Sequence, residues 1–263
     1  MPLACSTIGF AMVPLDNALQ HIALSGYEYV EVGVLGSFCP HLDPRAPIEE
    51  TVRVCEEMSE DHGIRIAALN SAPSLYHDED TDAHDVAERL LAICRGLGCD
   101  LIIDVGERTA DAIGGRSRAA TRIRRTLRRG LEVYGVRVMV EAPHRETEAE
   151  TVNEAAELLQ ALSDDVVPLV YDTSHAPFGG HDIAAGLRLL GDRIARVHAR
   201  DYRGDDGCVT PGDGEYAWGA LAAFLRRRPV PVCVELEFGG RLSPADVATE
   251  AVRARGFLEE VVL

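Results

Sequence analysis

The chain has 263 residues, 46% of them hydrophobic, which is enough for one sizeable core, so we expect a single domain over residues 1–263. Its net charge of −17 argues against a nucleic-acid partner, because nucleic-acid binders carry a basic face. All 26 basic residues are arginine, which excludes enzymes that form a Schiff base through a lysine.

Short apolar runs alternate along the chain with longer amphipathic segments. The apolar runs predict strands at Leu3–Ile8, Tyr27–Val32, Ile64–Leu69, Asp100–Val105, Arg137–Glu141, Val167–Asp172, Ile194–Ala199 and Pro231–Glu237. The amphipathic segments predict helices near residues 15–25, 47–62, 83–97, 115–134, 149–162, 181–190, 216–228 and 243–260. Ser243 before Pro244 is a typical helix start, and glycines such as Gly63 and Gly135 stand where helices should end.

Eight strand–helix units in a chain of this length predict a closed (β/α)8 TIM barrel, an α/β fold in which helices cover a parallel sheet. A doubly wound open sheet is the alternative. It is weakened because no G-x-G-x-x-G motif follows the first predicted strand. The basic run at 116–129 fits the solvated face of the fourth helix, with Ala119, Ile123 and Leu127 as its buried stripe.

The last four predicted strands all end in side chains that can bind a metal. They read VMVEAPH, LVYDTSH, RVHARD and VCVELEF, and they end at Glu141, Asp172, His198 and Glu235. In a TIM barrel the carboxyl ends of the strands carry the chemistry. Three buried carboxylates without compensation are costly, so the pattern indicates one divalent cation, either Mn²⁺, Mg²⁺, Co²⁺ or Zn²⁺. Unrelated ion pairs with arginines are the competing explanation.

Glu237 competes with Glu235, because strand side chains alternate and the two should face the same way. We prefer Glu235, since it ends its apolar run as Glu141 ends VMV. Glu237 would then lie higher in the site or pair with an arginine. Glu31, which ends the second strand, either reaches the site or forms an ion pair with an arginine inside the barrel.

The chain resembles the xylose isomerase-like TIM-barrel superfamily of sugar isomerases and epimerases, inosose isomerases and dehydratases, and the endonuclease IV type of repair enzyme. The motifs that carry the resemblance are YEYVEVG, EAPH, DTSH, VHARD followed by PGDGEYAW, and VELEF. The resemblance implies that Glu141, Asp172, His198 and Glu235 hold the metal, with both glutamates as acid and base, and that His175 contacts substrate. The endonuclease branch needs further histidines that this chain lacks in the corresponding places.

The resemblance also implies a substrate-binding arginine after the seventh strand. Arg203 is one candidate, although it follows His198 by five residues where the family spacing is six, and Arg200 is the nearer alternative. For both, a surface ion pair with Asp201 or Asp205 is the competing interpretation. His144 is expected to orient Glu141, and Tyr76 and His77 to close over substrate. Trp218 is expected to be a core or interface residue. Surface or packing positions are expected for His21, His62 and His84.

One divalent ion in a barrel mouth suits a small polyhydroxy carbonyl substrate, because the ion can stabilise an enediolate while two carboxylates move the proton. The first hypothesis is therefore a metal-dependent isomerase or epimerase of a keto-sugar or inosose, in carbohydrate metabolism. The second is a dehydratase or lyase acting on an inosose or a dehydroshikimate-like hydroxy-ketone. A third, less favoured, is a non-catalytic barrel that binds a metabolite.

The remaining features bear on location and assembly. No run of about 18 apolar residues occurs, and the start MPLACSTIGF lacks the basic and apolar regions of a secretory signal. The seven cysteines are scattered without a C-x-x-C pair, so we expect reduced core thiols in a cytoplasmic protein with no membrane partner. The resemblance implies a homodimer or homotetramer.

Overall fold

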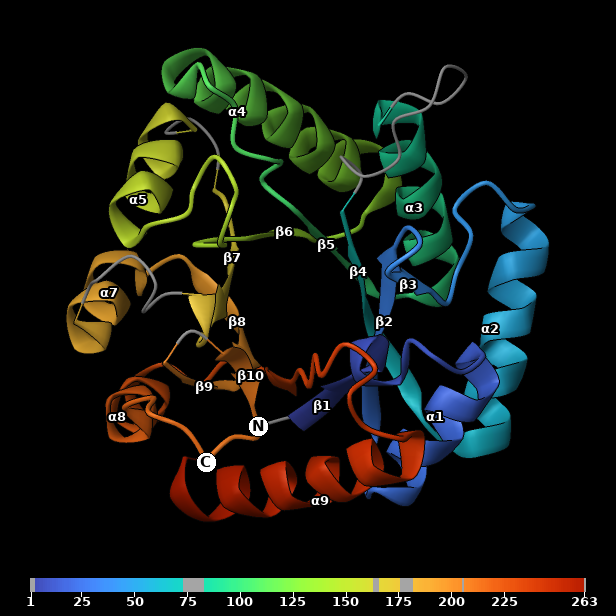
Figure 1. The fold of residues 1–263 in the computed structure, drawn as a ribbon. Helices are drawn as coiled ribbons and strands as arrows, with labels where there is room; N and C mark the ends of the chain where they lie inside the picture. Colours follow the sequence, from blue (N-terminus) through green and yellow to red (C-terminus); the bar gives the residue numbers. More distant parts are fainter. Residues whose placement is uncertain (1–2, 73–82, 163–165, 176–181, 205, 263) are drawn as a thin grey trace.

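The computed structural model describes residues 3–72, 83–162, 166–175, 182–204 and 206–262 of the chain. Within them, eight parallel strands pair in a ring and helices surround the ring (Figure 1). The strands, in their order around the ring, are β1 (Leu3–Ser6), β11 (Val232–Val234), β8 (Ile194–Ala199), β7 (Leu169–Asp172), β6 (Val138–Glu141), β5 (Asp100–Ile103), β4 (Arg65–Ser71) and β2 (Tyr29–Leu35). Pairing of β1 with β2 closes the barrel, so the predicted (β/α)8 fold is confirmed.

The helices of the outer layer lie close to their predicted positions. They are α1 (Leu15–Leu24), α2 (Ile48–His62), α3 (Ala83–Leu97), α4 (Ala112–Arg129), α5 (Val152–Ala161), α7 (Ile183–Leu190), α8 (Trp218–Arg227) and α9 (Pro244–Val261). Ser243 caps α9, since its side chain accepts a hydrogen bond from the amide of Asp246. Gly63 ends α2 with a φ of 63°, a left-handed conformation that favours glycine.

Several predicted boundaries are wrong at the ends of elements; the second strand, for example, ends at Leu35 and not at Val32. The first strand stops at Ser6, because the chain turns into the 3-10 helix η1 (Thr7–Phe10). The fourth helix starts earlier than predicted and ends in a π turn, η3 (Gly130–Tyr134). The last strand is short, because the backbone leaves the ladder after Val234. Two small additions are β3 (Cys39–Pro40), antiparallel to β2, and the hairpin of β9 (Asp201–Arg203) with β10 (Asp206–Val209).

Apolar side chains fill both sides of the barrel wall. Residues such as Leu69, Leu101 and Leu169 belong to the large core between strands and helices. A separate small cluster, Ala68, Ile102, Met139 and Val170, comes from the alternate positions of β4, β5, β6 and β7 and so lies inside the ring. On α4, Ala119 and Ile123 are buried and Leu127 is half-buried, as the stripe in the basic run predicts.

The cysteines and the helices agree with two further expectations. All seven cysteines are free and buried, so the prediction of core thiols is confirmed. Among the described helices, none combines the length and the apolar character that a membrane crossing requires. Of the helical histidines, His21 stacks on Phe10, with ring centroids 5.6 Å apart, and His62 pairs with Asp16 at 2.8 Å.

Candidate metal centre

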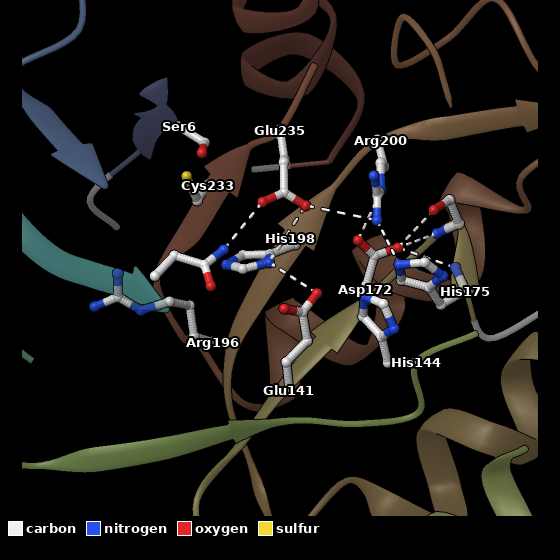
Figure 2. A network of polar contacts seen from close by, with 12 residues as sticks. Ser6, Glu141, His144, Asp172, His175, Arg196, His198, Arg200, Cys233 and Glu235 are labelled. Atoms are coloured by element: carbon white, nitrogen blue, oxygen red, sulfur yellow. Dashed lines mark hydrogen bonds and ion pairs between the residues drawn. The ribbon is translucent and has the colours of Figure 1, made fainter. Parts of the chain in front are cut away.

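Four predicted ligands meet at the carboxyl ends of neighbouring strands. Glu141 and Asp172 are the last residues of β6 and β7, His198 is the last but one of β8, and Glu235 directly follows β11. Figure 2 shows their side chains turned toward a common centre. Nδ1 of His198 lies 3.3 Å from Oε1 of Glu141 and 3.6 Å from Oε2 of Glu235. All four residues are buried.

The strand register explains why these side chains converge. Asp172 and Cys233 are the direct partners of His198 on the two neighbouring strands, so all three point into the barrel at one level. Glu235 stands two residues after Cys233, and its amide still donates to the carbonyl of Ala199. A shift of any of these strands by one residue would turn its ligand outward, so the parallel register itself builds the site.

The four side chains fit one divalent ion. One ligand atom from each, three carboxylate oxygens and an imidazole nitrogen, lies within 4.8 Å of all the others. An ion with bonds of about 2.1 Å holds opposite ligands about 4.2 Å apart, so small side-chain shifts would close the shell. Carboxylate-rich sets with one imidazole suit Mn²⁺, Mg²⁺, Co²⁺ and Zn²⁺. Such an ion would also balance three carboxylates buried side by side.

The two glutamates of the centre differ in proton affinity. Burial raises the pKa of Glu235 to about 8, since the opposing attraction of His198 and Arg200 does not offset the loss of water. Burial acts on Glu141 as well, but the charge and hydrogen bond of His198 lower its pKa to about 2. Two carboxyl groups whose environments separate their pKa values can take the roles of base and acid.

His198 is held from below by Glu31, which the sequence placed either in the site or in an ion pair. Nε2 of His198 lies 2.9 Å from Oε2 of Glu31, and Oε1 of Glu31 accepts from Nη1 of Arg196. Both predicted roles of Glu31 are therefore combined in one buried carboxylate. Burial alone would raise the pKa of Glu31, but Arg196 and His198 lower it to about 2.

Arg200 closes the other side of the centre. Its Nε donates to Oδ2 of Asp172 at 2.8 Å, its Nη2 lies 3.7 Å from Oε2 of Glu235, and its Nη1 donates to Glu237. Burial would lower the pKa of Arg200, but these carboxylates raise it well above its ordinary value. Glu237 thus pairs with an arginine, as one of the two predicted possibilities had it, and 36% of its side chain is exposed.

The rings of the two histidines beside the centre are in contact, tilted by 39° to one another. The rings of His144 and His175 have centroids 3.9 Å apart, and a nitrogen of each lies within 4.8 Å of a Glu141 carboxylate oxygen. Nη2 of Arg200 lies 2.5 Å from Nε2 of His175, so the imidazole accepts this bond. Burial, with the positive charges of His144 and Arg200, lowers the pKa of His175 well below its usual value. The one acceptor nitrogen of a neutral His175 is therefore taken up by Arg200.

The fold does not place Arg203 among the residues of the candidate metal centre. It is exposed in β9, and its guanidinium donates to the backbone carbonyl of Asp213. Asp201, predicted as a surface partner for an arginine, is fully buried instead. Trp218 is a core residue, as predicted, and its indole N–H donates to Asp201. Tyr76, His77 and Asp205 lie outside the described residues.

Two contributors to the site escaped the sequence interpretation. Asn70, near the end of β4, donates from Nδ2 to Oε1 of Glu235 at 3.2 Å. Arg196 stands two residues before His198 on β8 and therefore faces the barrel interior too. Both residues could have been found from the period-two alternation along the strands, which also pointed to the four predicted ligands. A cavity of about 300 Å³ opens above the centre, with Asn70, Glu141, Arg200 and Glu235 in its wall.

Sequence comparisons match a family over most of the chain. A sequence model described as "Xylose isomerase-like TIM barrel" matches residues 19–260. Inosose dehydratases from Geobacillus kaustophilus and Clostridium tetani are 40% and 37% identical over 62 and 135 residues, covering 24% and 44% of this chain. These matches span only 20% and 45% of the two relatives. The inosose isomerase of Bacillus velezensis is 22% identical over 94% of both chains.

Solved structures share the fold over the full chain. The D-psicose 3-epimerase of Clostridium cellulolyticum H10, solved with D-tagatose, has a TM-score of 0.77 and 17% identity, covering 100% of this chain and 99% of its own. The IOLI protein with a bound zinc atom has a TM-score of 0.76 and 20% identity, with the same coverage. At these identities the likeness establishes the barrel fold alone.

Proposed function

Because the chain belongs to the xylose isomerase-like TIM barrel family, we propose that it is a divalent-metal-dependent isomerase or epimerase of a keto-sugar, an inosose or a related polyhydroxy carbonyl compound. The observation that carries the proposal is the convergence of Glu141, Asp172, His198 and Glu235 within 4.8 Å. The names of the relatives, inosose isomerase and dehydratase, and the epimerase fold neighbours support the substrate class.

The residues of the site have the properties that such a reaction needs. A bound divalent ion would supply Lewis-acid chemistry, polarising a carbonyl and making the neighbouring C–H more acidic. Glu141, with its low pKa, would be ionised and able to take the proton, and Glu235 would return one. His175 and Arg200 would hold substrate oxygens at the mouth. Return of a proton to the opposite face of the same carbon gives epimerisation, and return to the adjacent carbon gives isomerisation.

A dehydratase is the second candidate. It is favoured by the two inosose dehydratases, which have the higher identities over the segments they match. The same site would serve, since removal of the α-proton can be followed by loss of a β-hydroxyl instead of reprotonation.

Residues 1–263 would act as one domain, supported by the direct pairing of the first strand with the last.

A substrate panel in heavy water separates these reactions. Metal-depleted protein is reloaded with Mn²⁺, Mg²⁺, Co²⁺ or Zn²⁺ and incubated with ketohexoses and inososes, and products are followed by mass spectrometry. Deuterium gained without other mass change supports the isomerase or epimerase, whereas loss of water supports the dehydratase. Protein that binds none of the four ions, or that is equally active in chelator, contradicts the proposal.

Two matched variants connect activity to the site. Glu141→Gln should lower the rate by about 10²- to 10⁴-fold, because it removes a group that moves the proton. Glu28→Gln is the control, since its side chain is 78% exposed and precedes β2, at the opposite end of the barrel. An unchanged rate in Glu141→Gln would contradict the assignment of Glu141.

A further inference from the structure

A line of alternating charges runs through the barrel interior beneath the centre. Nη2 of Arg196 lies 3.1 Å from Oδ2 of Asp100, the first residue of β5, and its Nη1 donates to Oε1 of Glu31. Oε2 of Glu31 then lies 2.9 Å from Nε2 of His198. The line therefore leads from the amino-terminal end of β5 to an imidazole at the opposite mouth.

This line occupies space that the fold would otherwise fill with apolar side chains. Ala68, Ile102, Met139 and Val170 face the barrel interior from β4, β5, β6 and β7, and Ala68 is the register partner of Asp100. Arg196 is the register partner of the apolar Val170 and is itself only 3% exposed. Its Nε has no hydrogen-bond partner among the described residues. Replacing a buried ion pair by apolar groups is often neutral or stabilising, so stability alone does not account for these charges.

The geometry gives the charges a role at His198. An imidazole with its Nε2 hydrogen bonded to a carboxylate presents an unprotonated Nδ1 to a cation on its other side. Nδ1 of His198 is the atom that lies 3.3 Å from Glu141 and 3.6 Å from Glu235. Glu31 has both oxygens engaged, one by Arg196 and one by His198, so Arg196 fixes the carboxylate that fixes the imidazole.

We propose that Glu31 and Arg196 are positioning residues: Glu31 orients His198 with Nδ1 toward Glu141 and Glu235, and Arg196 holds Glu31 in place. The inference rests on the proposed metal centre but goes beyond its ligand shell. It predicts that a guanidinium with no contact to the ion sets how tightly and in what geometry the ion is bound.

The test uses Co²⁺, whose visible absorption reports ligand geometry, added to the purified metal-free chain. Arg196→Met should weaken Co²⁺ binding by about 10- to 100-fold and alter the absorption spectrum. Arg196→Lys should recover part of the affinity, because it keeps a cation beside Glu31. Arg137→Met is the matched control. Arg137 contacts Asp100, the carboxylate that Arg196 also contacts, and its Nη2 lies 2.5 Å from Oδ2. Unlike Arg196, however, Arg137 has a side chain that is 49% exposed.

A double variant keeps the test decisive if Arg196→Met does not fold. Glu31→Leu with Arg196→Met removes both charges and should keep the thermal unfolding temperature of the metal-free chain while losing Co²⁺ affinity. Wild-type affinity and spectrum in the folded variants would overturn the inference and leave the metal centre standing. Absence of Co²⁺ binding in the wild type itself would overturn the proposed function, and the inference with it.

Discussion

Nε of Arg200 lies 2.8 Å from Oδ2 of Asp172, and the same guanidinium contacts Glu235 and Glu237. One cation from the end of β8 thus offsets three carboxylates from the ends of two other strands. In the metal-free chain, Arg200 therefore takes part of the charge-balancing role that a divalent ion would have. Its removal should affect the metal-free chain far more than the loaded one.

Arg200→Met should lower the free energy of unfolding of the metal-free chain by about 3–5 kcal/mol, because it leaves buried carboxylates without their partner. The stabilisation gained on adding Mn²⁺ should be larger than in the wild type. Thermal unfolding with and without Mn²⁺ measures both. Arg203→Met is the control, since Arg203 is exposed and, within the described part of the chain, its guanidinium donates to a backbone carbonyl and not to a buried carboxylate. Equal behaviour of the two variants would contradict the role given to Arg200.

Removal of the ion should itself destabilise the wild type. A ligand that binds only the folded state at 100 times its dissociation constant adds about 2.7 kcal/mol to the free energy of unfolding. We expect Mn²⁺ to raise the unfolding temperature and a chelator to reverse the effect. Asp172→Asn should abolish the response, because Asp172 would supply a buried ligand oxygen to the proposed ion. Asp16→Asn, at an exposed ion pair, should respond like the wild type. A persistent shift in Asp172→Asn would argue against this ligand.

The free energy of unfolding of the metal-free chain should depend on pH through the titration of Glu235. Its pKa of about 8 in the folded state exceeds the ordinary 4.5, because burial favours the neutral carboxyl. A raised pKa gives stability that is fully present below about pH 4.5 and is lost as the pH rises to about 8. The wild type should therefore lose stability relative to Glu235→Gln over this range, by up to about 1.4 kcal/mol per pH unit.

Chemical denaturation at several pH values measures this difference. Other groups that titrate in the same range are present in both proteins, so the comparison reports Glu235 together with its effect on the pKa of His198. Parallel curves for the wild type and Glu235→Gln would show that Glu235 titrates normally. Adding Mn²⁺ should remove the loss at high pH, because the ion competes with the proton for the same oxygen.

The sequence predicted the cluster of four side chains because period-two alternation and strand ends are local properties. Glu141, Asp172 and His198 each end or nearly end an apolar run, and parallel strands bring such ends together. Pairs such as Arg196 with Glu31 join residues 165 apart in the chain, so their contact depends on the closure and stagger of the barrel. The choice between Arg200 and Arg203 likewise depended on where β8 ends and the β9 hairpin begins.

Asp201 illustrates a second kind of contact that local patterns do not show. Its buried carboxylate accepts from the backbone amides of Tyr202, Gly212, Gly214 and Tyr216 and from the indole of Trp218, at 2.8–3.1 Å. A Cβ at position 214 would lie 2.2 Å from Oδ1 of Asp201, so only glycine allows this approach. The carboxylate thereby fixes the whole loop between β10 and α8.

Asp201→Ala should consequently lower the free energy of unfolding by at least about 3 kcal/mol, because each buried donor left unsatisfied costs about 1–3 kcal/mol. Gly214→Ala should destabilise the chain through the same contact. Urea unfolding measures both. Asp213→Ala, in the same loop, removes an exposed ion pair with Arg253 at 2.9 Å and should cost no more than about 1 kcal/mol. If Asp201→Ala proved as stable as Asp213→Ala, the loop would owe its order to other contacts, because the five donors would then have found water.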